Sequence, residues 1–93
     1  MLIKRQPTAS EKALKFEFSI KGSKFLIKNF TDGDIYVDLG ENEDKEVMIL
    51  IPAATSQICM IQELGTPWSQ TDVVTIIPAA TSEKGVEVQC LKW

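Results

Sequence analysis

The sequence contains no histidine among its 93 residues. This absence removes the side chain that most often acts as a general base near neutral pH and that most often binds transition metals. Cys59 and Cys90 therefore have no imidazole partner that could activate them as nucleophiles. The serines and lysines show no spacing typical of a Ser-Lys dyad, and no glycine-rich phosphate loop is present. We expect a protein that is not an enzyme and that carries no cofactor.

A basic stripe and a long apolar run are also missing. The net charge is −3 and the two signs are mixed along the chain, which disfavours nucleic-acid binding. No stretch approaches the roughly 18 apolar residues that a membrane helix needs. Lys4 and Arg5 are not followed by the apolar segment of a signal peptide. We therefore expect a protein without a secretory signal that binds neither nucleic acid nor membranes.

The two cysteines each lie within an apolar stretch that resembles a strand. Cys59 and Cys90 fit two interpretations: free thiols that act as small core residues, or a disulfide if their strands are close in space. Because no secretory signal is present, a reducing compartment is the default and free thiols are favoured.

A twelve-residue sequence segment is repeated in the chain. Residues 46–57 and 72–83 share seven of their twelve positions, at an offset of 26 residues (Pro78 minus Pro52). Each copy has an apolar strand, a proline that ends it and an Ala-Ala-Thr-Ser turn. Proline fixes φ, and threonine and serine hydroxyls bond to the turn backbone. The repeated segment is therefore predicted to have a structural role and not to form a binding site.

Alternating apolar and polar residues predict an all-β fold. The expected strands, separated by turn signals, cover residues 14–20, 25–30, 35–39, 47–51, 58–61, 73–77 and 86–93. About seven short strands favour a single small antiparallel β-sandwich, Ig-like or jelly-roll-like, with a small barrel as the alternative. Residues 14–93 form the domain, and residues 1–13 form an arm that is either mobile or an edge strand. Asp32-Gly33 predicts a hairpin, and Ser10 predicts one helical turn.

Two groups of residues are candidates for contacts with other molecules. Tyr36 and Trp68 could meet a sugar, or Trp68 could close one end of the core. Asp32-Gly33-Asp34 is too short for a calcium-binding loop, and Asp38 is expected to project from a strand. We therefore interpret the acidic stretch 32–44 as solvated turns and expect no bound metal. Residues 47–51 and 73–77 are apolar on both faces and need cover on two sides, which an oligomer would provide. The expected interface residues are Met48, Leu50, Val74, Ile76 and Trp93.

Three segments carry a resemblance to a known class of protein. Residues 24–37, with Lys28-Asn29-Phe30-Thr31, together with residues 51–56 and 85–90, resemble small structural β-sandwich proteins of phages and prophages, often head-decoration or head-fibre components. The resemblance spans residues 14–93. It implies a virion component, located in the bacterial cytoplasm or the virion, that contacts copies of itself or a capsid or tail subunit. Ala54 and Ala80 stand where the resemblance leads us to expect glycine, so we expect no left-handed backbone there.

These observations favour a non-enzymatic structural or assembly protein. The alternative is a carbohydrate- or cell-surface-binding module that uses Tyr36 and Trp68. A third hypothesis, an intracellular regulator with an acidic face, has only the small net charge behind it.

Overall fold

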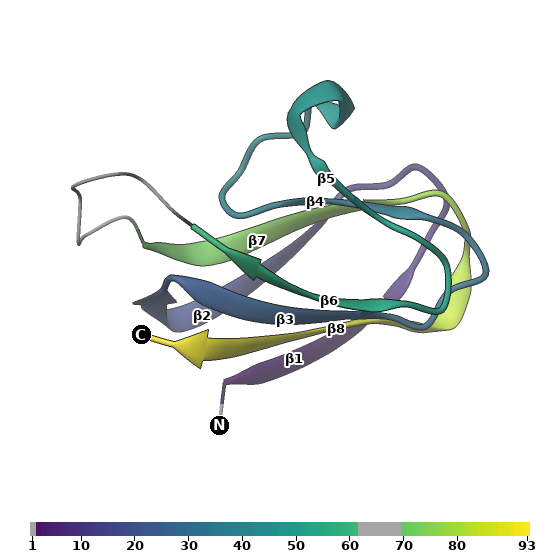
Figure 1. Ribbon diagram of the computed structural model, residues 1–93. Helices are drawn as coiled ribbons and strands as arrows, with labels where there is room; N and C mark the ends of the chain where they lie inside the picture. Colours follow the sequence, from purple (N-terminus) through teal and green to yellow (C-terminus); the bar gives the residue numbers. More distant parts are fainter. Residues whose placement is uncertain (1, 62–69) are drawn as a thin grey trace.

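The computed structural model describes residues 2–61 and 70–93, and these residues form two four-stranded antiparallel sheets packed face to face (Figure 1). One sheet has the order β1-β8-β3-β6 and the other β2-β7-β4-β5. The strands are β1 (Ile3–Thr8), β2 (Leu14–Gly22), β3 (Lys24–Asn29), β4 (Ile35–Asp38), β5 (Ile49–Ile51), β6 (Ser56–Met60), β7 (Thr71–Pro78) and β8 (Ser82–Lys92). A short 3₁₀ helix, η1 (Lys45–Val47), precedes β5. The expected β-sandwich is confirmed, and the two separate sheets do not close into a barrel.

The strand pairing follows a simple rule along the chain. β1 pairs with β8, β2 with β7, β3 with β6 and β4 with β5, as if one long antiparallel hairpin had been rolled into two sheets. This order is that of a jelly roll, and of the two sandwich types expected it is the one observed. The Asp32-Gly33 hairpin prediction is wrong, because β3 and β4 belong to different sheets.

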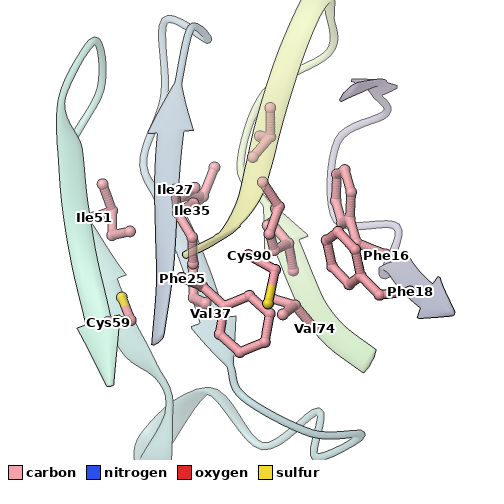
Figure 2. Close-up of a cluster of buried hydrophobic side chains, with 13 residues drawn as sticks. Phe16, Phe18, Phe25, Ile27, Ile35, Val37, Ile51, Cys59, Val74 and Cys90 are labelled. Atoms are coloured by element: carbon pink, nitrogen blue, oxygen red, sulfur yellow. The ribbon is translucent and has the colours of Figure 1, made fainter. Parts of the chain in front are cut away.

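The core lies between the sheets and is built by the period-2 alternation of the strands. Phe16 and Phe18 from β2 meet Phe25 and Ile27 from β3 there (Figure 2). The Phe18 and Phe25 rings lie 5.8 Å apart between centroids, in a tilted arrangement. Burying one such side chain contributes about 1.5–3 kcal/mol, so these aromatic residues are a major source of stability.

Cys59 and Cys90 lie on either side of Phe25, which is the cross-strand partner of both (Figure 2). Two strand spacings of about 4.8 Å separate them, well beyond the Cα separation of about 4.4–6.8 Å that a disulfide allows. Both thiols are free, as favoured from the sequence. Burial raises the pKa of each thiol, which makes both poorly reactive.

The two copies of the repeated segment lie at two of the three places where the chain passes from the β2-β7-β4-β5 sheet to the other sheet. Pro52 directly follows β5, and Pro78 ends β7. The two turns differ in backbone, because Ala54 has a φ of 56° whereas Ala80 is not left-handed. The expectation that neither alanine would be left-handed is therefore wrong for Ala54.

Four connections meet at the end of the sandwich that holds the repeated turns. The buried Asn29 amide donates to Ile51 O at 3.3 Å and Pro52 O at 3.1 Å, and its oxygen accepts from the Thr31 hydroxyl at 2.7 Å. These bonds tie the β3–β4 connection to the first repeated turn. The connection is therefore fixed against the neighbouring crossover rather than closing a hairpin.

The segment between β1 and β2 reaches the second repeated turn. Ser10 donates its hydroxyl to Ala79 O at 2.9 Å, and its N–H donates to the Thr81 hydroxyl at 3.0 Å. The expected helical turn after Ser10 is absent; Ser10 and Glu11 form a turn, and Glu11 has a φ of 61°. Before that turn, Ile3–Thr8 forms an edge strand on β8.

Candidate protein-interaction surface

Exposed apolar side chains gather on the outer face of the β1-β8-β3-β6 sheet. Phe25 and Ile27 point into the core, so Leu26 between them points outward, and Ile58 and Met60 likewise flank the buried Cys59. Leu26 is paired with Ile58 on one side and with Gln89 on the other, and Gln89 is paired with Ile3. The exposed fractions are 41% for Ile3, 52% for Ile58 and 51% for Met60. Because Gln89 separates Ile3 from Leu26, we call only Leu26, Ile58 and Met60 the outer apolar patch.

A charged row borders this patch on the same face. One carboxylate oxygen of Glu87 accepts from Arg5 at 2.8 Å. The other accepts from Gln89 at 2.8 Å and lies 3.5 Å from Lys28 Nζ. The hydrogen bond from Arg5 is the main reason that the pKa of Glu87 is lowered, with the Gln89 bond next and burial opposing both. Each charged side chain in this row therefore already lies next to a side chain of opposite charge.

An open hollow of about 380 Å³ lies beside that row. Arg5, Phe30, Glu83 and Lys84 line it, and the Arg5 guanidinium lies 5.9 Å from the Phe30 ring centroid. The guanidinium is already bonded to Glu87. The Arg5 guanidinium in this hollow is therefore already paired within the protein.

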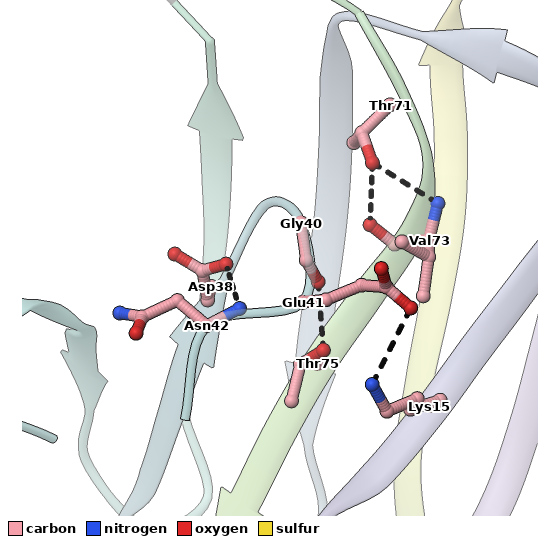
Figure 3. A network of polar contacts seen from close by, with 8 residues as sticks. All are labelled: Lys15, Asp38, Gly40, Glu41, Asn42, Thr71, Val73 and Thr75. Atoms are coloured by element: carbon pink, nitrogen blue, oxygen red, sulfur yellow. Dashed lines mark hydrogen bonds and ion pairs between the residues drawn. The ribbon is translucent and has the colours of Figure 1, made fainter. Parts of the chain in front are cut away.

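The interface prediction for Val74 and Ile76 is wrong. Both are fully buried, because they pair with Phe16 and Leu14 on the core side of β7. The opposite side of β7 is covered by the connection between β4 and β5. Thr75 on that side donates its hydroxyl to Gly40 O at 2.7 Å (Figure 3).

The same connection reaches across to β2. Glu41 lies 3.5 Å from Lys15 Nζ, and Lys45 forms an ion pair with Glu11 while its Nζ lies 5.1 Å from the Tyr36 ring centroid. The chain thus supplies the second layer of cover that the sequence led us to assign to an oligomer.

The other expected contact residues do not form one surface. Leu50 is 48% exposed and opposite Tyr36 on the outer side of the β2-β7-β4-β5 sheet, and Met48 is half-buried just after η1. Trp93 is 64% exposed and follows β8 in the other sheet. Tyr36 is half-buried beneath Lys45, and Trp68 lies outside the described residues. Sequence reasoning missed Leu26, Ile58 and Met60, although their alternation with core residues was a usable signal.

Acidic side chains of the stretch 32–44 bond to nearby backbone. Asp38 accepts from the Asn42 N–H at 2.9 Å, and Asp44 caps η1 by accepting from the Glu46 N–H at 3.0 Å. Within residues 2–61 and 70–93, no group of three or more His, Cys, Asp or Glu side chains is placed to hold a metal ion. Across the same residues, no helix has the length and apolar character to span a membrane.

Comparisons with protein-family models, with curated proteins and with solved structures gave no match.

Proposed function

We propose that this chain is a non-enzymatic structural or assembly protein that uses the outer apolar patch for contacts with other protein subunits. The observation that carries the proposal is the exposure of Ile58 and Met60 beside Leu26 on an open sheet face. Contiguous exposed apolar groups of this kind are typical of protein–protein contact sites. In line with the sequence resemblance, we propose a phage or prophage virion component whose partners are copies of itself or a capsid or tail subunit.

The chemistry of the described residues supports a contact role. The buried polar side chains, such as Asn29, Thr31 and Thr75, bond to the protein itself. Among the described residues, no buried side-chain nitrogen or oxygen lacks a hydrogen-bond partner. A jelly roll occurs both in viral capsid proteins and in lectins, so the fold agrees with the proposal without deciding between it and carbohydrate binding.

Solution mass tests the proposal. Size-exclusion chromatography with light scattering, over a tenfold concentration range, should show a mass above the 10.4 kDa of one chain. The double variant Ile58→Lys with Met60→Lys should return the protein to a monomer with an unchanged fold by circular dichroism. The matched control is Val47→Lys with Leu50→Lys, which adds the same charge at exposed residues of the η1–β5 segment and should keep the mass.

A monomer at every concentration contradicts self-association through this patch and leaves a capsid or tail subunit as the proposed partner. The carbohydrate-binding alternative then also becomes a hypothesis to test, with Tyr36 as its half-buried aromatic contact. A glycan-dependent change in fluorescence that is lost in Tyr36→Ala would support it.

A further inference from the structure

The sandwich has four edge strands, and three of them carry features that discourage pairing with another chain. β1 has Lys4, Arg5 and Pro7, and β5 is three residues long and is followed by Pro52. β2 has a charged residue at positions 15, 17 and 21. Charges, proline and short length are the usual devices that protect a sheet edge. β6 reads Ser-Gln-Ile-Cys-Met and has none of them.

Among residues 2–61 and 70–93, the backbone of β6 pairs with another strand on one side only. The Asn29 N–H donates to Thr55 O at 2.9 Å and the Ile61 N–H donates to Ser23 O at 2.9 Å, so the odd-numbered residues bond to β3. In an antiparallel ladder the alternate residues then direct N–H and C=O away from β3. Among the described residues, β3 is the one strand paired with β6 (Figure 1). The open groups belong to Ser56, Ile58 and Met60.

We propose that β6 pairs with β6 of a second copy of this chain, antiparallel, about a two-fold axis through Ile58. This inference rests on the proposed function and identifies the partner at the same surface. The axis places Ile58 opposite Ile58 and Ser56 opposite Met60, and about six backbone hydrogen bonds join the two copies. The result is a continuous sheet that runs from β1 of one copy to β1 of the other.

The absence of charged residues on β6 favours pairing with a second copy at this edge over self-pairing at the other edges. A two-fold pairing sets each residue against its own symmetry mate or near neighbour, and like charges directly opposite one another destabilise a sheet. β6 has no charged residue, so self-pairing there opposes no like charges. Lys4 and Arg5 on β1 would face the same residues of a second copy.

The side chains continue the outer apolar patch across the two-fold axis. Leu26 is the cross-strand partner of Ile58, so the row Leu26-Ile58 of one copy meets Ile58-Leu26 of the other. Met60 extends the contact along the strand. Four apolar side chains thus stand in one row at the centre of the joined sheet, and the exposed Ile58 gains cover there.

Amide hydrogen exchange gives the first test, because it has a signature specific to this edge. On raising the protein concentration, the N–H groups of Ser56, Ile58 and Met60 should become at least about tenfold more protected. Those of Gln57 and Cys59 should change little, because they already bond to β3. This measurement uses the unmodified protein and needs no variant to fold.

A proline substitution gives the second test. Ile58→Pro removes an N–H that points away from β3, and proline is tolerated on an edge strand at such a position. Self-association should weaken about thirtyfold, since the two N–H donors of the Ile58 pair are lost. The control is Ile3→Pro, which removes an outward N–H from β1 at the opposite edge of the same sheet and should leave the dissociation constant unchanged.

The outcomes separate this inference from the proposed function. Alternating protection together with the Ile58→Pro effect supports both. If the protein self-associates but the amides of Ser56, Ile58 and Met60 stay unprotected, β6 is not the contact site. The same holds if the two proline substitutions weaken self-association equally. Either result leaves the assembly role in place. A monomer at every concentration overturns the β6 pairing and the self-association part of the proposed function.

Discussion

The left-handed backbone at Ala54 predicts that glycine at this position stabilises the fold. Ala54 has a φ of 56° and is exposed, so its methyl group has little packing to lose. The left-handed conformation costs an L-residue roughly 1–2 kcal/mol, and glycine avoids this cost. Glycine also gains unfolded-chain entropy, which opposes the benefit by about 0.5–1 kcal/mol. The net expectation for Ala54→Gly is a gain of about 0.5–1 kcal/mol in the free energy of unfolding.

The second copy of the repeated segment supplies a control for Ala54→Gly in the same chain. Ala80 occupies the equivalent place in the second copy, and its backbone is not left-handed. Ala80→Gly therefore relieves no strain and adds only the entropic cost, so it should lower stability by about 0.5–1 kcal/mol. The two substitutions have the same chemistry, the same flanking Pro-Ala and Thr-Ser residues and opposite expected signs.

Urea unfolding followed by far-ultraviolet circular dichroism measures both effects. For a domain of this size, 1 kcal/mol corresponds to a melting-temperature shift of about 4–8 °C, so the opposite signs are resolvable. Ala54→Asn should fall between alanine and glycine, because asparagine tolerates the left-handed region better than alanine does. Equal destabilisation by Ala54→Gly and Ala80→Gly would refute the reasoning.

Two further predictions concern β8. Gly85 has a φ of +64°, and a Cβ there would lie 1.8 Å from Gln6 O, so Gly85→Ala should cost more than about 3 kcal/mol by urea unfolding. Gly33→Ala, whose Cβ would lie 3.0 Å from that of Ala80, should cost less, and equal losses would count against this explanation. The pKa of Glu87 is lowered from about 4.5, so its stabilising effect is complete above that pH and is lost as the pH falls through the folded-state value. Urea midpoints measured on acidification should therefore fall less steeply in Glu87→Gln than in the unmodified protein, and parallel curves would argue against the Glu87 contribution.

Local alternation was enough to find the strands. Phe16 and Phe18 alternate with charged residues in β2, and Phe25 and Ile27 alternate with Leu26 and Lys28 in β3, so both were expected close to their observed limits. Period-2 patterning is a property of a few consecutive residues and needs no knowledge of the partner strand. The same holds for the prolines that end β5 and β7.

Such local patterns do not determine the order of the strands within each sheet. Asp32-Gly33 carries a local hairpin signal, yet the connection joins two different sheets because Asn29 bonds to the carbonyls of Ile51 and Pro52. Those partners are more than twenty residues away in the chain, and no short-range rule names them. A local turn preference of this kind is outweighed when a buried amide satisfies several distant backbone groups.

The position of the interaction surface also could not be predicted from local sequence patterns. An apolar strand face needs cover, and the sequence correctly marked residues 73–77 as apolar on both sides. It does not say what provides the cover, and here the β4–β5 connection does so through Gly40 and Thr75. Alternation with the buried Cys59 places Ile58 and Met60 on an outer face, but it does not show that β6 is an edge strand. The surface left for a partner is therefore the one whose cover the chain does not supply, and identifying it requires the order of the strands as well as their composition.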